Sequence, residues 1–291
     1  MADELKNYLD EHQDSKVCIL DNNSVEFMNK LKNNGISTDL IFNQYDIVII
    51  PSWVAEEIND SVYRKAFIEE LKNKGILIYE VEEKDYIYLV NGEELNILNI
   101  CLFSVGKVAV INSYIRKEII GGNNLDDIDY EYKEWIEKLY NEWPMPRRQI
   151  TRSNNVIREQ KKNAGEISIT IIANILSYYY PNLKTITLMT YDKDCYDYVK
   201  YSEEKLLDYK GFLGRENSKI TFKSNDVILF ELVNKITSLE VLKEIINMVR
   251  MPRKVRYSKQ KEDMSFEEYI EVVDNNKLLE IIEDTSLHII F

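Results

Sequence analysis

Histidine is scarce in this chain of 291 residues, and the motifs that hold common cofactors are absent. The only two histidines, His12 and His288, lie near the ends of the sequence, so histidine-centred catalysis is poorly supplied. The sequence contains no GxSxG elbow, no GxxxxGKS/T phosphate loop and no GxGxxG fingerprint. Serine-hydrolase, nucleotide-fuelled and nicotinamide-linked functions therefore lose their main support.

Cysteines and long apolar runs are also few. Cys18, Cys101 and Cys195 are far apart and form no CxxC pair, which argues against a disulfide framework or a zinc site and favours a reducing compartment. Each is expected to be a small buried hydrophobic residue. No apolar run approaches the roughly 18 residues of a membrane span, and the acidic, polar residues 1–14 do not resemble a secretory signal. We expect a soluble, cytoplasmic protein without a membrane partner.

Positive charge is in short supply overall but is concentrated in two places. The formal net charge is −13, which by itself argues against a nucleic-acid partner. Residues 147–162 and 250–261 nevertheless hold 12 of the 37 cations and one of the 50 acids. Either run can be read as a solvated helix face, but two such runs in an acidic chain indicate contacts with an anionic partner.

Strand and helix patterns alternate along the chain, which predicts βαβ units and a mainly parallel sheet in an α/β fold. Helices are predicted at residues 61–73, 157–179 and 227–236, and shorter ones follow the first two strands, with Ser24 and Ser52 as their expected N-caps. The expected strands are residues 16–20, 46–50, 76–81, 185–189 and 220–223.

Two segments fall outside this alternation. Residues 80–155 are predicted to be a helical insertion, in which residues 86–90 form either one arm of a hairpin or a loop before a helix. Residues 237–291 are predicted to be a helical extension, with a helix at 238–251 and one or two more at 265–282. The core domain would then span residues 14–236.

Carboxylates are the remaining candidates for catalytic groups. Asp21 follows the first strand, and Asp192 and Asp194 follow the fourth, while Glu57 and Glu166 lie on predicted helices. Acids gathered at the carboxyl edge of a parallel sheet repel one another and must share protons or bind cations. Oxygen ligands suit Mg²⁺ or Mn²⁺, which can clamp a phosphodiester and activate water. Taken singly, each acid could instead be a turn, cap or surface residue.

Together these acids resemble a known set of motifs. Asp21-Asn22-Asn23 is similar to the D-x-N that ends the first strand of PIN-domain nucleases, and residues 51–58 (PSWVAEEI) to their P-x-x-V-x-x-E-L/I. Gly165-Glu166 resembles their G-E helix, and residues 190–194 (TYDKD) their T-x-D-x-D. The four motifs occur in the order of the family, each on the expected kind of element.

The resemblance implies a three-layer, parallel-sheet α/β fold and metal-dependent cleavage of RNA. It implies Asp21, Glu57, Glu166 and Asp192 as catalytic metal ligands, and Asp194 as a fifth or substitute ligand. Thr190 and Asn23 would orient these acids. The interval between Glu57 and Glu166 is longer than in small toxin-like members, so the inserted segment could cap, gate or block the site.

The resulting hypothesis is an endonuclease that uses Mg²⁺ or Mn²⁺ to hydrolyse phosphodiester bonds of RNA. The basic runs would guide the nucleic-acid backbone toward the acids. The predicted contacts are Arg147, Arg148, Arg152, Arg158, Lys161, Lys162, Arg253, Lys254 and Arg256. Tyr191 or Trp53 could stack a base, although packing is the more ordinary role of either ring.

Three alternatives remain open at this stage. The chain could be a PIN-like module that binds RNA or a protein without cutting, or a DNA-directed nuclease of the same chemistry. It could also be a phosphohydrolase that uses Asp192-Lys193-Asp194 as nucleophile and acid. A protein inhibitor or a second copy of the chain is a further candidate partner, and a toxin, an RNA-processing enzyme and a phage-defence effector would share these features.

Overall fold

In the computed structural model, which describes residues 2–121, 131–152, 156–233 and 239–291, five parallel strands form a central sheet in the order β3-β2-β1-β6-β7. Apolar residues fill these strands because helices cover both faces. The strands are β1 (Lys16–Leu20), β2 (Ile47–Pro51), β3 (Ile78–Val81), β6 (Thr185–Met189) and β7 (Ile220–Lys223). The predicted parallel α/β fold is confirmed, and each predicted strand lies within two residues of its expected bounds.

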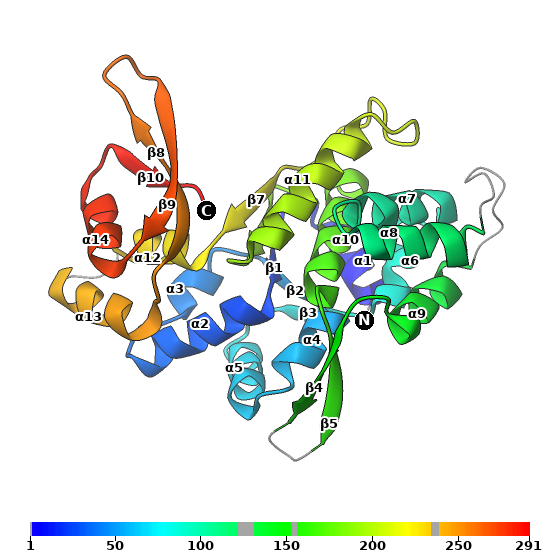
Figure 1. Ribbon diagram of the computed structural model, residues 1–291, viewed down its shortest axis with the longest axis horizontal. Helices are drawn as coiled ribbons and strands as arrows, with labels where there is room; N and C mark the ends of the chain where they lie inside the picture. The colour runs from blue at the N-terminus through cyan, green and yellow to red at the C-terminus, as the bar shows by residue number, and fades with distance from the viewer. Residues whose placement is uncertain (1, 122–130, 153–155, 234–238) are drawn as a thin grey trace.

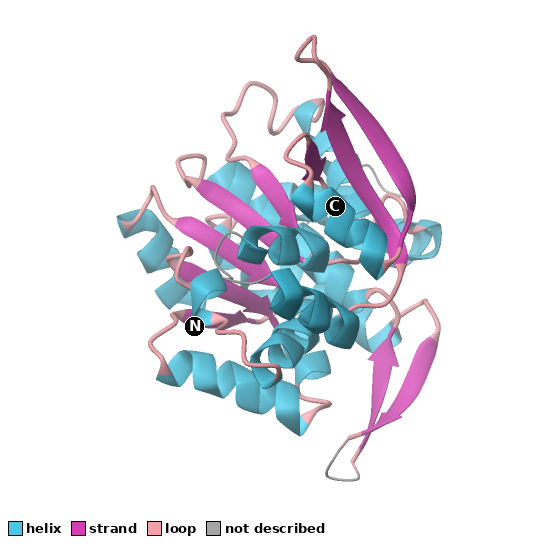
Figure 2. Ribbon diagram, turned by 90° about the vertical axis from the view of Figure 1, so that its left-hand side faces the viewer, coloured by secondary structure: helices cyan, strands magenta, loops and turns pink. Residues whose placement is uncertain are grey.

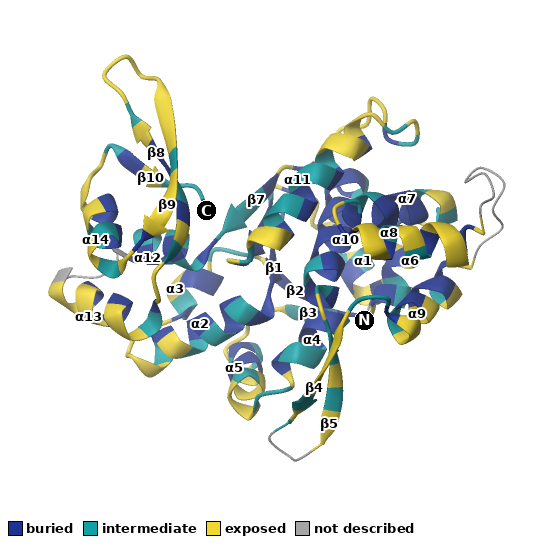
Figure 3. Cartoon of the chain, in the orientation of Figure 1, coloured by how far each residue is buried: buried dark blue, intermediate teal, exposed yellow. Residues whose placement is uncertain are grey.

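Helices on both sides of the sheet make three layers (Figure 1). The helices α2, α3 and α5 lie on one side, and α1, α10 and α11 lie on the other. The central helix α10 packs against β1, β2 and β6 and is buried along most of its length (Figure 3), which explains its nearly continuous apolar sequence. The bounds are α1 (Ala2–Glu11), α2 (Asn22–Asn33), α3 (Asp39–Phe42), α4 (Ser52–Ile58), α5 (Val62–Asn73), α10 (Ala164–Tyr179), α11 (Lys193–Leu207) and α12 (Asn225–Val233).

The strand order places a topological switch point between β1 and β6. The chain runs from β1 to β2 in one direction across the sheet and later enters β6 on the other side of β1. Leu20 pairs with Met189 in the last register position, and the backbone N–H of Asp21 donates to the carbonyl of Met189 at 3.1 Å. Ligands of open α/β sheets bind outside the carboxyl ends of such strands, so the loops after β1 and β6 form the candidate site.

The segment between β3 and α10 is mostly helical, as predicted, but ends in a β-hairpin. Residues 86–90 do not form a hairpin arm, because they lie in and just after α6. The predicted helix at 157–179 is wrong at its start, since residues 157–161 pair antiparallel with residues 147–151. The elements are η1 (Glu83–Asp85), α6 (Tyr86–Leu89), α7 (Glu94–Ser104), α8 (Ala109–Tyr114), η2 (Ile115–Ile119), α9 (Tyr132–Glu142), β4 (Arg147–Thr151) and β5 (Ile157–Lys161).

The C-terminal segment matches the expected helical extension only in part: α13 corresponds to the predicted helix at 238–251 and α14 overlaps the predicted 265–282, but a three-stranded sheet lies between and beside them. Residues 266–273 form strand β9 instead of a helix and pair along their whole length with β8, in an antiparallel sheet of order β10-β8-β9. The basic β8 faces the acidic β9, and Arg256 pairs with Glu268 across the ladder, so opposite charges stabilise this pairing. The elements are α13 (Leu239–Val249), β8 (Arg253–Gln260), β9 (Phe266–Val273), α14 (Asn275–Glu283) and β10 (Leu287–Ile289).

The first basic run therefore covers the antiparallel ribbon β4–β5, and the second leads into strand β8 of the ribbon β8–β9. Figure 2 shows these ribbons on the same side of the molecule, one at the lower right and one at the upper right. The three cysteines are buried and free, as predicted. Within the part of the chain that the structure describes, no helix has the length and apolar character needed to cross a bilayer.

A buried ion pair joins the C-terminal segment to the core. The guanidinium of Arg250 donates to both carboxylate oxygens of Asp226, from Nε at 2.7 Å and from Nη2 at 3.3 Å. Its Nη1 donates to the carbonyl of Val273 at 2.9 Å and to the Oδ1 of Asn275 at 3.1 Å. Asp226 is fully buried and Arg250 is 7% exposed, so neither charge has water as an alternative partner. The end of α13 is thereby tied to the start of α12.

We predict that Arg250→Met lowers the free energy of unfolding by about 3–5 kcal/mol, because it leaves the Asp226 carboxylate buried without its main partner. Chemical denaturation of the full chain measures this change. Arg256→Met is the matched control and should cost less than about 1 kcal/mol, since its pair with Glu268 is solvent-exposed. Adding Asp226→Asn to Arg250→Met should recover part of the loss, and equal costs for the two arginine variants would contradict this account.

Candidate active site

Asp21 lies at the carboxyl end of β1 and is almost fully buried, at 4% exposure. It occupies the N-cap position of α2, but its side chain makes no capping hydrogen bond. Its Oδ2 instead accepts a hydrogen bond of 2.9 Å from the Oγ1 of Thr190, which follows β6. The same Thr190 oxygen accepts the backbone N–H of Asp192 at 3.0 Å. Thr190 therefore connects the ends of the two strands at the switch point.

The two acids of the β6 loop face different surroundings. Asp192 is half-buried, and its charge raises the pKa of Asp21 and of Glu166. Asp194 is exposed, and its backbone N–H donates to the Oδ1 of Asp192 at 2.7 Å, which caps α11. Asp192 is thus the acid of this loop that faces Asp21, while Asp194 supports its position.

Helices α4 and α10 bring Glu57 and Glu166 to the same edge. Gly165 lies where the two helices meet, and a Cβ added there would make only ordinary contacts, 3.4 Å from the Cγ2 of Val54 and 3.7 Å from the Oε1 of Glu57. The Nδ2 of Asn22, which directly follows Asp21, donates to the Oε2 of Glu57 at 3.4 Å. The Gly165-Glu166 motif therefore lies directly against Glu57.

Burial raises the pKa of three of these acids, and other acids of the site add to two of the shifts. Burial, followed by the charges of Asp21, Asp192 and Glu57, raises the pKa of Glu166 to about 8. Burial raises the pKa of Asp21 to about 7, with Glu57 and Asp192 adding to the shift and the Thr190 hydrogen bond opposing it. Burial also raises the pKa of Glu57, against the effect of Gln160 and Arg158. A carboxyl group shifted in this way is stabilised by either a proton or a cation.

The donor atoms of this edge suit a hard divalent cation. They are carboxylate oxygens, joined by the buried Oδ1 of Asn22, which has no hydrogen-bond partner among the described residues. In the described ranges, no three His, Cys, Asp or Glu side chains already converge into a group that could hold a metal ion. The chemistry of the donors fits Mg²⁺ or Mn²⁺, for which Asp21, Glu166 and Asp192 would be the ligands.

A cationic pocket adjoins these acids. It has a volume of about 370 Å³ and lies between the acids of α4 and α10 and the β4–β5 hairpin. Asn23 contributes to its wall from α2. The cations that line it belong to the first predicted basic run and are Arg147, Arg148, Lys161 and Lys162.

Arg152 and Arg158, also predicted to contact nucleic acid, are engaged within the protein. The Nε atoms of Arg152 and Arg158 donate to the Oδ1 of Asp60 at 3.0 and 2.9 Å. Arg158 also pairs with Glu56, at 3.3 Å. These two arginines attach the hairpin to the end of α4 and so position the four pocket cations beside Glu57.

The residues of the second basic run that were predicted to contact nucleic acid also differ in their surroundings. Arg256 pairs with Glu268, and Lys254 is exposed on the ribbon. Arg253 lines a different pocket, which shares Asn23 with the hairpin pocket. Of the four predicted acids, Glu57 and Glu166 line the hairpin pocket, while Asp21 and Asp192 lie near them at the ends of β1 and β6 and no β8 residue lines this pocket.

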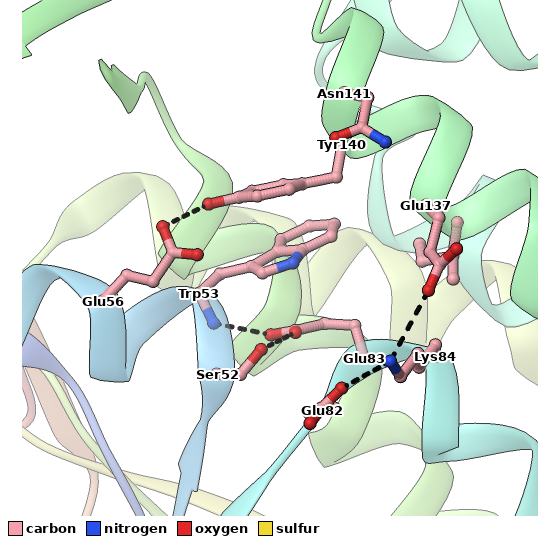
Figure 4. Close-up of a pocket in the computed structure, with 10 residues that line it drawn as sticks. Ser52, Trp53, Glu56, Glu82, Glu83, Lys84, Glu137, Tyr140 and Asn141 are labelled. Atoms are coloured by element: carbon pink, nitrogen blue, oxygen red, sulfur yellow. Dashed lines mark hydrogen bonds and ion pairs between the residues drawn. The ribbon is translucent and has the colours of Figure 1, made fainter. Parts of the chain in front are cut away.

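A buried glutamate that sequence reasoning missed fixes the two acid-bearing helices. Glu83, at 3% exposure, accepts hydrogen bonds from the backbone N–H of Trp53 at 2.9 Å and from the Oγ of Ser168 at 2.7 Å. Its other oxygen accepts from the hydroxyl of Ser52 (Figure 4). Ser52 and Trp53 begin α4, and Ser168 lies two residues after Glu166 on α10, so Glu83 is a positioning residue for both helices.

No local pattern marks Glu83 in the sequence. It lies in the charged stretch of residues 82–85 (EEKD), which looks like a solvated turn. Its burial depends on the inserted segment, because the hydroxyl of Tyr132 in α9 donates to the Glu83 carbonyl at 2.8 Å. The insertion is therefore part of the support of the site, rather than an appendage to it.

Searches for relatives returned nothing: the chain matches no protein-family model, no curated protein and no solved structure. The resemblance to PIN-domain nucleases consequently depends on the motifs and on the place where the fold brings them together.

We predict that Glu83→Gln removes a pH-dependent part of the stability. Burial raises the pKa of Glu83 to about 7, whereas the unfolded chain releases this proton near pH 4.5. The folded protein therefore binds more protons between these values and loses stability as the pH rises through them. Relative to wild type, the free energy of unfolding of Glu83→Gln should increase by about 3 kcal/mol between pH 4.5 and pH 7.

Denaturation curves at a series of pH values measure this difference. Glu82→Gln is the control, because its side chain is 59% exposed and it should follow the wild-type pH dependence. Parallel pH curves for wild type and Glu83→Gln would contradict the assignment of a raised pKa to Glu83.

Proposed function

We propose that this chain is a PIN-like, metal-dependent nuclease that hydrolyses phosphodiester bonds of RNA. The observation that carries the proposal is that Asp21, Glu57, Glu166 and Asp192 lie near one another at one edge of a parallel sheet, where Glu57 and Glu166 line a pocket with four cations. Such a pairing of acids and cations suits a site that binds both a divalent metal and a phosphate. The choice of RNA follows from the resemblance of the four motifs to those of PIN-domain ribonucleases.

Each residue of the site has a distinct task. Asp21, Glu166 and Asp192 would hold the metal, and Thr190 orients Asp21 through its hydroxyl. Glu57, held by Asn22 and close to Gly165, completes the acidic wall. When bound there, Mg²⁺ or Mn²⁺ would polarise the phosphodiester and lower the pKa of water.

The hairpin supplies the contacts to the substrate backbone. Arg148 and Lys162 are exposed at the pocket and can donate to phosphate oxygens. Lys161 also lines the pocket, and its ammonium lies 3.7 Å from the centre of the Tyr140 ring. These cations also compensate the negative charge that would otherwise repel a polyanion from an acidic protein.

We predict metal-dependent cleavage of end-labelled single-stranded RNA by the wild type, with Mg²⁺ or Mn²⁺ and not with EDTA. Asp21→Asn, Asp192→Asn and Glu57→Gln should each lower kcat by at least about 100-fold, because each removes a charged oxygen from the site. Gel analysis of product formation measures this loss. Glu204→Gln and Asp208→Asn are matched controls at exposed acids that line neither pocket, and they should retain most activity.

Each other result has a definite meaning. Cutting that survives EDTA or all three acid substitutions would contradict the proposed site. Preferential cutting of single-stranded DNA would assign the same chemistry to a different substrate. Binding of RNA without cutting, and without metal uptake by calorimetry, would favour a non-catalytic module.

We predict that the double variant Arg148→Gln/Lys162→Gln raises KM for RNA more than it lowers kcat, since the two cations bind the backbone away from the reacting bond. The slope of log affinity against log salt should fall by about 1.4, at about 0.7 for each lost phosphate contact on a single strand. Lys117→Gln/Lys210→Gln removes two exposed cations outside the pocket and should leave KM and slope unchanged. Equal effects of both pairs would indicate only general charge attraction.

A further inference from the structure

A second pocket adjoins the hairpin pocket, with which it shares Asn23 of α2. It has a volume of about 330 Å³ and lies between α2, the loop after β6, the start of α12 and the turn that leads into β8. Its wall includes Asn23, Phe27, Tyr191, Asn225, Arg250 and Arg253. Pockets of about 300–1,000 Å³ accommodate single small molecules, so this one is large enough for one nucleotide-sized group.

The residues that line this pocket carry one more positive than negative charge. Asp226 is already paired bidentately with Arg250, and Arg253 lies 3.5 Å from the same carboxylate. Glu26 and Lys30, on the α2 wall, pair with each other at 2.8 Å. Arg253 is thus the additional cation of the pocket wall, with Asp192 as a further nearby acid outside it.

Arg253 is also incompletely hydrogen-bonded. Its Nη1 is buried without a hydrogen-bond partner among the described residues, and its Nε donates to the Lys254 carbonyl at 3.3 Å. The side chain lines the pocket and is 20% exposed, so part of it is open to a bound anion, which can accept charge-assisted hydrogen bonds from it.

An aromatic face accompanies the arginine. The guanidinium carbon of Arg253 lies 5.2 Å from the centre of the Tyr191 ring, which is 39% exposed at the pocket. Tyr191 stands between Thr190 and Asp192, both of which belong to the candidate active site. A stacking surface and a phosphate-binding cation side by side are the two elements that bind single-stranded nucleic acid.

The two pockets adjoin the acids. Asn23 lines both pockets and follows Asp21 by two residues, Glu57 and Glu166 line the hairpin pocket, and Tyr191, which precedes Asp192, lines the Arg253 pocket. A nucleic-acid chain bound over the hairpin cations and the acids can therefore continue to Tyr191. The pocket has room for one nucleotide-sized group. A base can therefore enter it only when it is not stacked on the neighbouring bases of its own strand.

We propose that the Arg253 pocket binds one nucleotide of a single-stranded RNA on one side of the bond to be cut, with its phosphate on Arg253 and its base on Tyr191. The proposal rests on the proposed nuclease function for its position relative to the reaction, but the binding can be measured without cleavage. It assigns to the C-terminal segment a role in selecting unpaired RNA.

The test uses the full chain carrying Asp21→Asn, so that binding is measured without cutting. Fluorescence anisotropy with a labelled oligouridylate gives Kd at several salt concentrations. Arg253→Gln should raise Kd about tenfold and lower the salt slope by about 0.7, because one phosphate contact is lost. Tyr191→Leu should raise Kd several-fold with an unchanged slope, because stacking is lost but charge is kept.

Arg215→Gln is the matched control, since Arg215 also lies over aromatic rings, 5.2 Å from Phe212, but outside both pockets. It should leave Kd unchanged, as should an excess of fully paired RNA duplex added as competitor. Thermal melting of each variant checks that it is folded, and Tyr191→Leu tests the pocket independently if Arg253→Gln is unstable.

The results separate this inference from the proposed function. Unchanged Kd in both folded variants, equal competition by duplex, or uridine monophosphate binding as tightly as the oligouridylate would overturn the single-strand pocket even if wild type cuts RNA. The expected Kd pattern with no cutting by wild type would support the pocket and overturn the nuclease proposal.

Discussion

The cost of burying acids beside one another is the constraint that organises this structure. Burial raises the pKa of Asp21, Glu57 and Glu166, and the charges of neighbouring acids add to the shifts of Asp21 and Glu166. A protein keeps such a group together only if its framework is rigid enough to resist the repulsion. The framework here consists of the β1–β6 pairing, the Thr190 hydroxyl, the packing of Gly165 against Glu57 and the hydrogen bonds of Glu83.

The same constraint explains how the cations are distributed. Most of the acidic surface has no concentrated positive charge, yet the cations of the hairpin lie directly beside the acids. Arg152 and Arg158 attach that hairpin to Asp60, so some of the basic run serves the structure and some faces the pocket. In the second run, Arg250 holds the C-terminal segment through Asp226, and Arg253 faces its own pocket. One stretch of basic sequence can thus contain both structural and ligand-facing residues.

The errors in the predicted elements have a common cause. The composition of residues 157–161 and 266–273 is compatible with either a helix or a strand, and the prediction was a helix. Whether such a segment becomes a strand depends on pairing with another segment, which its own sequence does not contain. Strand β5 exists because β4 lies beside it, and β9 because β8 supplies opposite charges. Glu83 was missed for a similar reason, since its burial requires Ser52, Ser168 and Tyr132 from three other segments. A local window contains none of these partners.

By itself, the sequence determined the parallel α/β core, the positions of its strands and the candidate acids that follow them. These features follow from local rules, because apolar runs bounded by turn residues need no distant partner to be recognised. Only the tertiary structure decided that Asp192 rather than Asp194 faces Asp21, that Arg152 and Arg158 are occupied by Asp60, and that a second pocket adjoins Tyr191. Those outcomes depend on which side chains from distant segments lie close together in the folded chain. Charge interactions and burial depend on distance in three dimensions rather than on distance along the sequence.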